Sequence, residues 1–78
     1  MIEILPIRRA IAITPDNDND QTVVFREIYV GGAGAVKVDM EVSGTVTFAA
    51  VPVGTTLVGN FKRVYSTGTT ATLLIGKW

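Results

Sequence analysis

Cysteine and histidine are both absent from this chain of 78 residues. Without cysteine no disulfide can cross-link the fold, and without thiol or imidazole groups a structural zinc site lacks its preferred ligands. The same absences remove the most common catalytic base and the most reactive side-chain nucleophile. The two serines, Ser43 and Ser66, fall in expected turns with no recognisable base beside them. We therefore predict that the protein is not an enzyme and needs no cofactor.

An excess of charge is also missing, because seven lysines and arginines balance seven acidic residues. Without a positive excess, no long-range field favours nucleic acid or an anionic membrane. No run approaches the roughly 20 apolar residues that span a bilayer. Residues 1–9 place their basic pair after a short apolar stretch, which is unlike a secretion signal. We expect no nucleic-acid partner, no membrane partner and no secretion signal.

Hydrophobic residues, in contrast, are plentiful, at 47% of the chain with a mean hydropathy of +0.38. A chain this short buries only roughly 60% of the surface that its unfolded form exposes. Apolar side chains beyond the small core then need a second surface. The composition therefore favours a homo-oligomer or a protein bound to a larger partner.

The order of residue types predicts β-strands throughout, since helical periodicity is absent and glycines and prolines divide the chain into short segments. The clearest strand alternates Val36, Val38, Met40 and Val42 toward a core with charged residues toward water. We predict strands at residues 8–14, 22–30, 36–42 and 45–48, one or two strands within 56–65, and a last strand at 70–78.

Glycines mark the expected turns of this fold. Residues 31–34 read as a tight hairpin turn, residues 36–48 as a hairpin closed by Ser43 and Gly44, and Gly59 as a bulge or bend. The strands predict an all-β fold, a small antiparallel β-sandwich or barrel of six to seven short strands. Residues 1–7 are expected to form an N-terminal arm, and residues 8–78 a single β domain.

One segment resembles a calcium-binding loop. Asp16, Asp18 and Asp20 have the spacing of an EF-hand loop, and calcium prefers several such oxygens at once. Gln21 stands where the sharp-turn glycine is needed, and the flanking residues read as strands. We therefore predict no metal site and interpret the segment as a solvated acidic turn that protects a sheet edge.

Other candidate sites have similarly plain explanations. The glycines of residues 31–34 lack the following helix and the lysine of a phosphate-binding loop. Asp39 and Glu41 share a strand face but alternate with Lys37, as on the wet face of a sheet. Trp78 is either a core residue or an anchor on a partner. A basic and aromatic set that could bind single strands is balanced by acidic residues; it comprises Arg8, Arg9, Arg26, Lys62, Arg63, Tyr29, Phe61 and Tyr65.

Five blocks of sequence, taken in order, resemble the small head spike base proteins of tailed phages and gene transfer agents: residues 12–16 (AITPD), 26–34 (REIYVGGAG), 45–49 (TVTFA), 51–54 (VPVG) and 62–72 (KRVYSTGTTAT). The resemblance covers most of the chain from Ala10 onward. The chain departs from the family pattern in a shorter N-terminal segment, in Glu27 and Ile28, and in the Asn- and Asp-rich form of the acidic turn.

The resemblance implies a structural virion protein that is made in the host cytoplasm and bound to the capsid exterior, as the base of a head spike or fibre at vertices. Its implied partners are copies of itself, as a pentamer or a trimer, the major capsid protein, and a spike or fibre protein. Three alternatives stay open: a capsid decoration (cement) protein, a small glycan- or ligand-binding β-module, and a calcium-stabilised β-domain.

Overall fold

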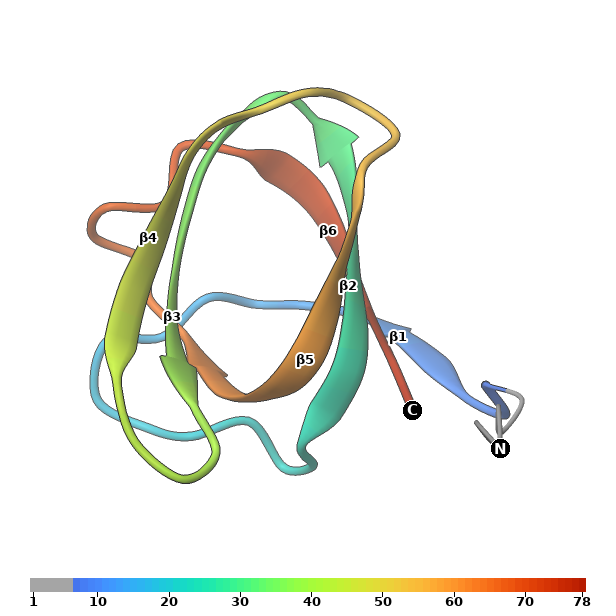
Figure 1. Cartoon of the computed structure of the whole chain (residues 1–78), viewed down its shortest axis with the longest axis vertical. Helices are drawn as coiled ribbons and strands as arrows, with labels where there is room; N and C mark the ends of the chain where they lie inside the picture. Colours follow the sequence, from blue (N-terminus) through green and yellow to red (C-terminus); the bar gives the residue numbers. More distant parts are fainter. Residues whose placement is uncertain (1–6) are drawn as a thin grey trace, which may run out of the picture.

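The fold is a single six-stranded antiparallel sheet that curls around its own core (Figure 1), described by a computed structural model over residues 7–78. The strands are β1 (Ala10–Ala12), β2 (Phe25–Gly32), β3 (Gly34–Met40), β4 (Thr45–Val51), β5 (Thr56–Val64) and β6 (Thr72–Lys77). They lie in the order β1-β6-β2-β5-β3-β4. The expected all-β, antiparallel fold of six short strands is confirmed. In the described part of the chain no helix is long and apolar enough to cross a membrane.

The N-terminal arm expected at residues 1–7 lies almost wholly outside the described residues, so that assignment stays a prediction. Within the described part, the strand expected at residues 8–14 is only the three residues of β1. β1 pairs with β6 alone, and all three of its residues are exposed. β1 is therefore an edge strand that adds little to the core.

β5 holds the sheet together because it pairs with β2 along its first half and with β3 along its second half. Gly59 and Asn60 stand opposite the single residue Arg26, which makes a bulge there and confirms the bulge expected at Gly59. A second register shift follows between Asp39 and Met40 of β3. Extra residues increase the twist of a strand, so β5 curves enough to serve both halves of the curled sheet.

The hairpin turn expected at residues 31–34 is wrong, because β2 and β3 are not paired and β5 lies between them. The chain instead turns a corner at Ala33, from one part of the sheet to the other (Figure 1). The glycines allow the start of β6 to pass closely. A Cβ at Gly31 would lie 2.6 Å from the Leu73 carbonyl oxygen, and one at Gly34 would lie 2.5 Å from the Ala71 nitrogen.

The hairpin expected at residues 36–48 is confirmed, since Val36 pairs with Phe48 and Val38 with Val46. Its turn is longer than expected, and the Met40 amide donates to the Gly44 carbonyl oxygen at 2.9 Å. The strand therefore ends at Met40. Val42, which was expected to face the core, lies in this turn and is 91% exposed, so that part of the prediction is wrong.

The core is formed where the two halves of the sheet face each other. Phe61 of β5 lies at its centre, fully buried, with its ring 6.4 Å from that of Phe48. Phe25, the cross-strand partner of Phe61, packs on Trp78, with ring centroids 5.7 Å apart. The remaining buried apolar residues are Ile13, Ile28, Val30, Val36, Val38, Val51, Val64, Ala71 and Leu74.

Candidate functional site

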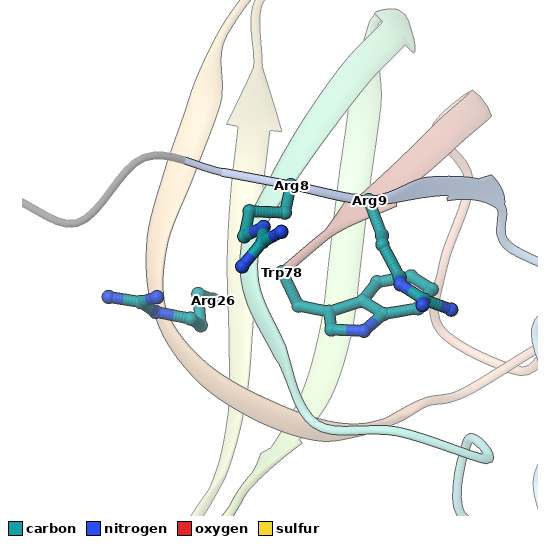
Figure 2. Close-up of a pocket in the computed structure, with 4 residues that line it drawn as sticks. All are labelled: Arg8, Arg9, Arg26 and Trp78. Carbon is teal, nitrogen blue, oxygen red and sulfur yellow. The ribbon is translucent and has the colours of Figure 1, made fainter.

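A basic pocket forms at the side of the sheet where β1, β6 and β2 meet. Arg8 and Arg9 precede β1, Arg26 belongs to β2 and Trp78 follows β6; together they line a cavity of about 470 Å³ (Figure 2). We call this site the arginine pocket. Backbone bonds set its geometry, because the Arg8 and Arg9 amides donate to the Trp78 carbonyl oxygen at 2.9 and 2.8 Å. The Trp78 amide donates in return to the Arg9 carbonyl oxygen at 2.9 Å.

The arginine pocket gathers positive charge in a chain whose net charge is zero. Among residues 7–78 the one ion pair is that of Arg63 with Asp20, at 2.9 Å, so no described carboxylate pairs with Arg8, Arg9 or Arg26. Guanidinium groups bind carboxylates and other anions through paired N–H groups. Trp78 adds an apolar wall and also packs on Phe25. The pocket is therefore suited to an anionic partner with some apolar surface.

The acidic turn of residues 16–20, here called the acidic loop, is ordered by its own side chains. Asp16 Oδ1 accepts hydrogen bonds from the amides of Asp18, at 2.8 Å, and Asn19, at 3.2 Å. The Asp18 amide, followed by the Asn19 side chain, lowers the pKa of Asp16 below its usual value. Asp20 Oδ1 accepts from Arg63 Nε. Within residues 7–78 no group of three acidic, histidine or cysteine side chains is arranged to hold a metal ion; the absence of a metal site stays a prediction.

Asn17 attaches the acidic loop to the turn that follows β5. Its Oδ1 accepts hydrogen bonds from the amides of Ser66, at 3.0 Å, and Thr67, at 2.9 Å, and its Nδ2 donates to Thr67 Oγ1 at 2.9 Å. Its carbonyl oxygen also accepts from Arg63 at 3.2 Å. The sequence did not single out Asn17, because nothing local indicates a partner about fifty residues away.

Asp39 and Glu41 do not form a carboxylate pair. Asp39 accepts hydrogen bonds from Thr45 Oγ1, at 2.5 Å, and from the Tyr65 hydroxyl, at 2.7 Å. These two bonds, that of Thr45 first, lower the pKa of Asp39 below its usual value. Glu41 lies beyond the end of β3 in an exposed turn. Asp39 is thus a structural acceptor on the outer face of the sheet.

The basic and aromatic residues considered for single-strand binding do not gather at one place, because Arg8, Arg9 and Arg26 line the arginine pocket and the others do not. Phe61 is fully buried, and Arg63 is bound to Asp20 of the acidic loop. Tyr65 lies under Lys37, whose Nζ is 4.8 Å from the ring centroid, and Tyr29 lies under Lys77 at 5.4 Å. No common stacking surface results from these positions. The expectation of no nucleic-acid partner stays a prediction.

β4 supplies a second exposed feature, at the edge of the sheet opposite β1. It contains seven residues and no charge, and most of its side chains are exposed, including Val46 at 40%. A free strand edge offers unpaired backbone groups to another strand. Apolar side chains are also exposed elsewhere, among them Val58 at 79% and Leu73 at 76%. The surface is thus rich in places where another protein can pack.

Of the comparisons with known proteins, the one with solved structures found a similar chain. No protein-family model and no curated protein sequence matches the chain. Among solved structures it is similar to a chain in "Capsid of native GTA particle computed with C5 symmetry", where GTA is a gene transfer agent. The two chains are 33% identical with a TM-score of 0.83, and the match covers 94% of this chain and 84% of that one.

The small all-β fold and this similarity together place the chain in a class, the capsid-associated structural proteins of phage-like particles. The sequence identity and the coverage of both chains are high enough to assign a family as well. This chain belongs to the same family as that capsid chain of a gene transfer agent.

Proposed function

We propose that the protein binds the outside of a phage-like capsid, at its vertices, and forms the base to which a head spike or fibre attaches. The observation that carries the proposal is the 33% identity to a gene transfer agent capsid chain, over 94% of this chain. The ordered blocks at residues 26–34 and 62–72, which resemble spike base proteins, narrow the role from the capsid in general to the spike base.

The fold supports this role through its surfaces. A spike base must bind the shell on one side and a fibre on another while keeping its own shape. The curled sheet offers two free edges, β1 and β4, on opposite ends of one strand order. The arginine pocket lies beside β1, away from β4. Two separate regions, the β1 edge with its neighbouring pocket and the β4 edge, are thus available for copies of the chain, for the shell and for a fibre.

Ring symmetry is part of the proposal. The particle that contains the similar chain was computed with C5 symmetry, and a five-fold vertex accommodates a ring of five copies. Closed rings are built from one contact that repeats head to tail. We therefore favour a pentamer over a trimer.

The test is electron cryomicroscopy of particles produced with and without the gene for this protein, with the gene supplied in trans as the control. We expect particles without the protein to lose density and spikes at the vertices while the heads remain intact. Heads that keep their spikes but break at a lower temperature would indicate a cement protein. Particles that are unchanged in both respects would contradict any capsid role outside the shell.

A further inference from the structure

Two groups of like charge lie on different sides of this fold, three arginines on one side and three aspartates on the other. The arginine pocket belongs to β1, β6 and β2. The acidic loop lies against the end of β5, where the Asp16 amide donates to the Val64 carbonyl oxygen at 2.8 Å. In Figure 1 this loop is on the left, and the described N-terminal residues and the C-terminus are on the right. The two charged surfaces therefore face different directions.

We propose that the arginine pocket of one copy receives the acidic loop of the next copy, in a contact that repeats head to tail. This inference rests on the proposed function, since it names the contact that builds the ring of a spike base. The occupant follows from charge complementarity. Three arginines without a described ion partner meet a loop that carries Asp16 and Asp18 beyond the Asp20 already paired with Arg63.

The acidic loop is prepared for such a contact before binding. Asn17 and Arg63 hold its backbone against the rest of the fold, so little order has to be gained on association. Asp18 uses its amide within the loop. Among the described residues its carboxylate has no hydrogen bond or ion pair, and the residue is exposed. Asp18 is therefore the carboxylate best placed to enter the pocket of a neighbour.

The arginine pocket is also pre-organised by backbone hydrogen bonds. The backbone bonds between Trp78 and residues 8 and 9 fix the positions from which two of the arginines extend. A carboxylate can be bound by two N–H groups of one guanidinium, while Trp78 covers apolar atoms of the incoming loop. Charge complementarity of this kind mainly fixes orientation and register, which is what a ring requires.

Because the two surfaces differ and point in different directions, the contact is heterologous. A heterologous contact produces a closed ring when its rotation divides a full turn, and a filament when it does not. The proposed contact uses no residue of β4, so the β4 edge is left for the shell or the fibre.

The experiment measures the oligomeric state of the purified chain by sedimentation velocity and light scattering. Arg26→Glu and Asp18→Arg each place like charges in the contact. Each is expected to raise the dissociation constant of the oligomer about tenfold or more. The double variant Arg26→Glu/Asp18→Arg restores opposite charges and is expected to recover the assembly. Lys37→Glu and Glu41→Arg are the matched charge reversals outside both surfaces and should leave it unchanged.

The salt dependence of self-association tests the same contact independently. Charges beyond about 8 Å are largely screened at physiological ionic strength, and closer pairs weaken as salt rises further. The oligomer should therefore weaken between about 0.05 M and about 0.5 M salt, and the double variant should keep this dependence. Circular dichroism melts of every variant show that it is folded.

The proposal is overturned if the wild-type chain is monomeric, if the two reversals leave the oligomer intact, or if the folded double variant does not recover it. Loss of binding to particles by Arg26→Glu, with self-association unchanged, would instead assign the pocket to an acidic surface of the shell. These outcomes are separate from those of the proposed function. If deletion of the gene removes the spikes but neither charge reversal weakens the oligomer, the spike base function is supported and this contact is rejected.

Discussion

Gly76 tests how tightly the core is packed at the end of the sheet that carries the arginine pocket. A Cβ at this position would lie 2.5 Å from Cδ1 and from Cε1 of Phe25, whereas carbon atoms in contact prefer about 3.5–4 Å. Phe25 is 1% exposed and packs on Trp78, so its ring has no free space to enter. Overpacking of this kind costs about 1–3 kcal/mol, and the short distance places Gly76→Ala at the upper end.

A loss of that size is easily measured in a chain this small. One kcal/mol shifts the melting temperature of a domain of this length by about 4–8 °C, so a loss of about 3 kcal/mol should make Gly76→Ala melt about 12–24 °C below the parent. The assay is a circular dichroism melt at one fixed protein concentration, because association itself adds stability. Phe25→Leu should relieve the clash, and the double variant should be less unstable than the two separate losses predict, by about 1 kcal/mol. A Gly76→Ala melt within error of the parent, or strict additivity with Phe25→Leu, would refute the packing argument.

Three further predictions concern the acidic loop, the pH dependence of stability and the free edge. Asn17→Ala removes the hydrogen bonds between the acidic loop and the turn after β5. We expect the free energy of unfolding, measured by chemical denaturation, to fall by about 1–2 kcal/mol and the Thr67 amide to exchange faster. Unchanged exchange at Thr67 would contradict this attachment. The pKa values of Asp16 and Asp39 lie below the usual 3.8, so their contribution to stability is present above pH 3.8 and is lost as the pH falls through the lower folded values. Asp39→Asn should therefore make stability less dependent on pH in that acidic window, and acid titrations that coincide for both proteins would exclude this role. Val46→Lys places a charge on the β4 edge, where it should reduce association through that strand. The free energy of unfolding should change by no more than about 0.5 kcal/mol. If the variant binds particles as well as the wild-type protein does, β4 is not a docking edge.

The sequence predicts the strands of this fold better than their connections. Alternating residues set which side chains of β3 are buried, and Val36 and Val38 are both fully buried as expected. The glycines of residues 31–34 predict the wrong connection, because a glycine is favoured in two different situations. One is a positive φ in a turn, and the other is the close approach of another backbone. Only the position of Leu73 and Ala71 beside them distinguishes the two, and that position depends on the whole sheet.

The candidate site is less accessible to sequence reasoning for the same physical reason. Nothing in the sequence separates Arg8, Arg9 and Arg26 from Lys62 and Arg63, although only the first three line the arginine pocket. Trp78 packs against the core, as the first of its two alternatives expects, and it also lines the pocket; its role as an anchor on a partner stays a prediction. Antiparallel pairing of β6 with both β1 and β2 brings these residues together. Such contacts between distant segments leave no local pattern in the chain.

The sharing of β5 between the two halves of the sheet has a mechanical consequence for a protein at the foot of a fibre. Within the ladder of the sheet, a pull on β4 reaches β3, then β5, and through β5 it reaches β2 and β6. The strand pairing that joins the two halves of the sheet is therefore that of β5, whose two ends are hydrogen-bonded to different neighbours. The register shifts at Gly59 and before Met40 leave residues of β5 outside the regular ladder, so tension on this strand first strains the bonds that the Asn60 and Lys62 carbonyl oxygens accept from the amides of Glu41 and Gln21.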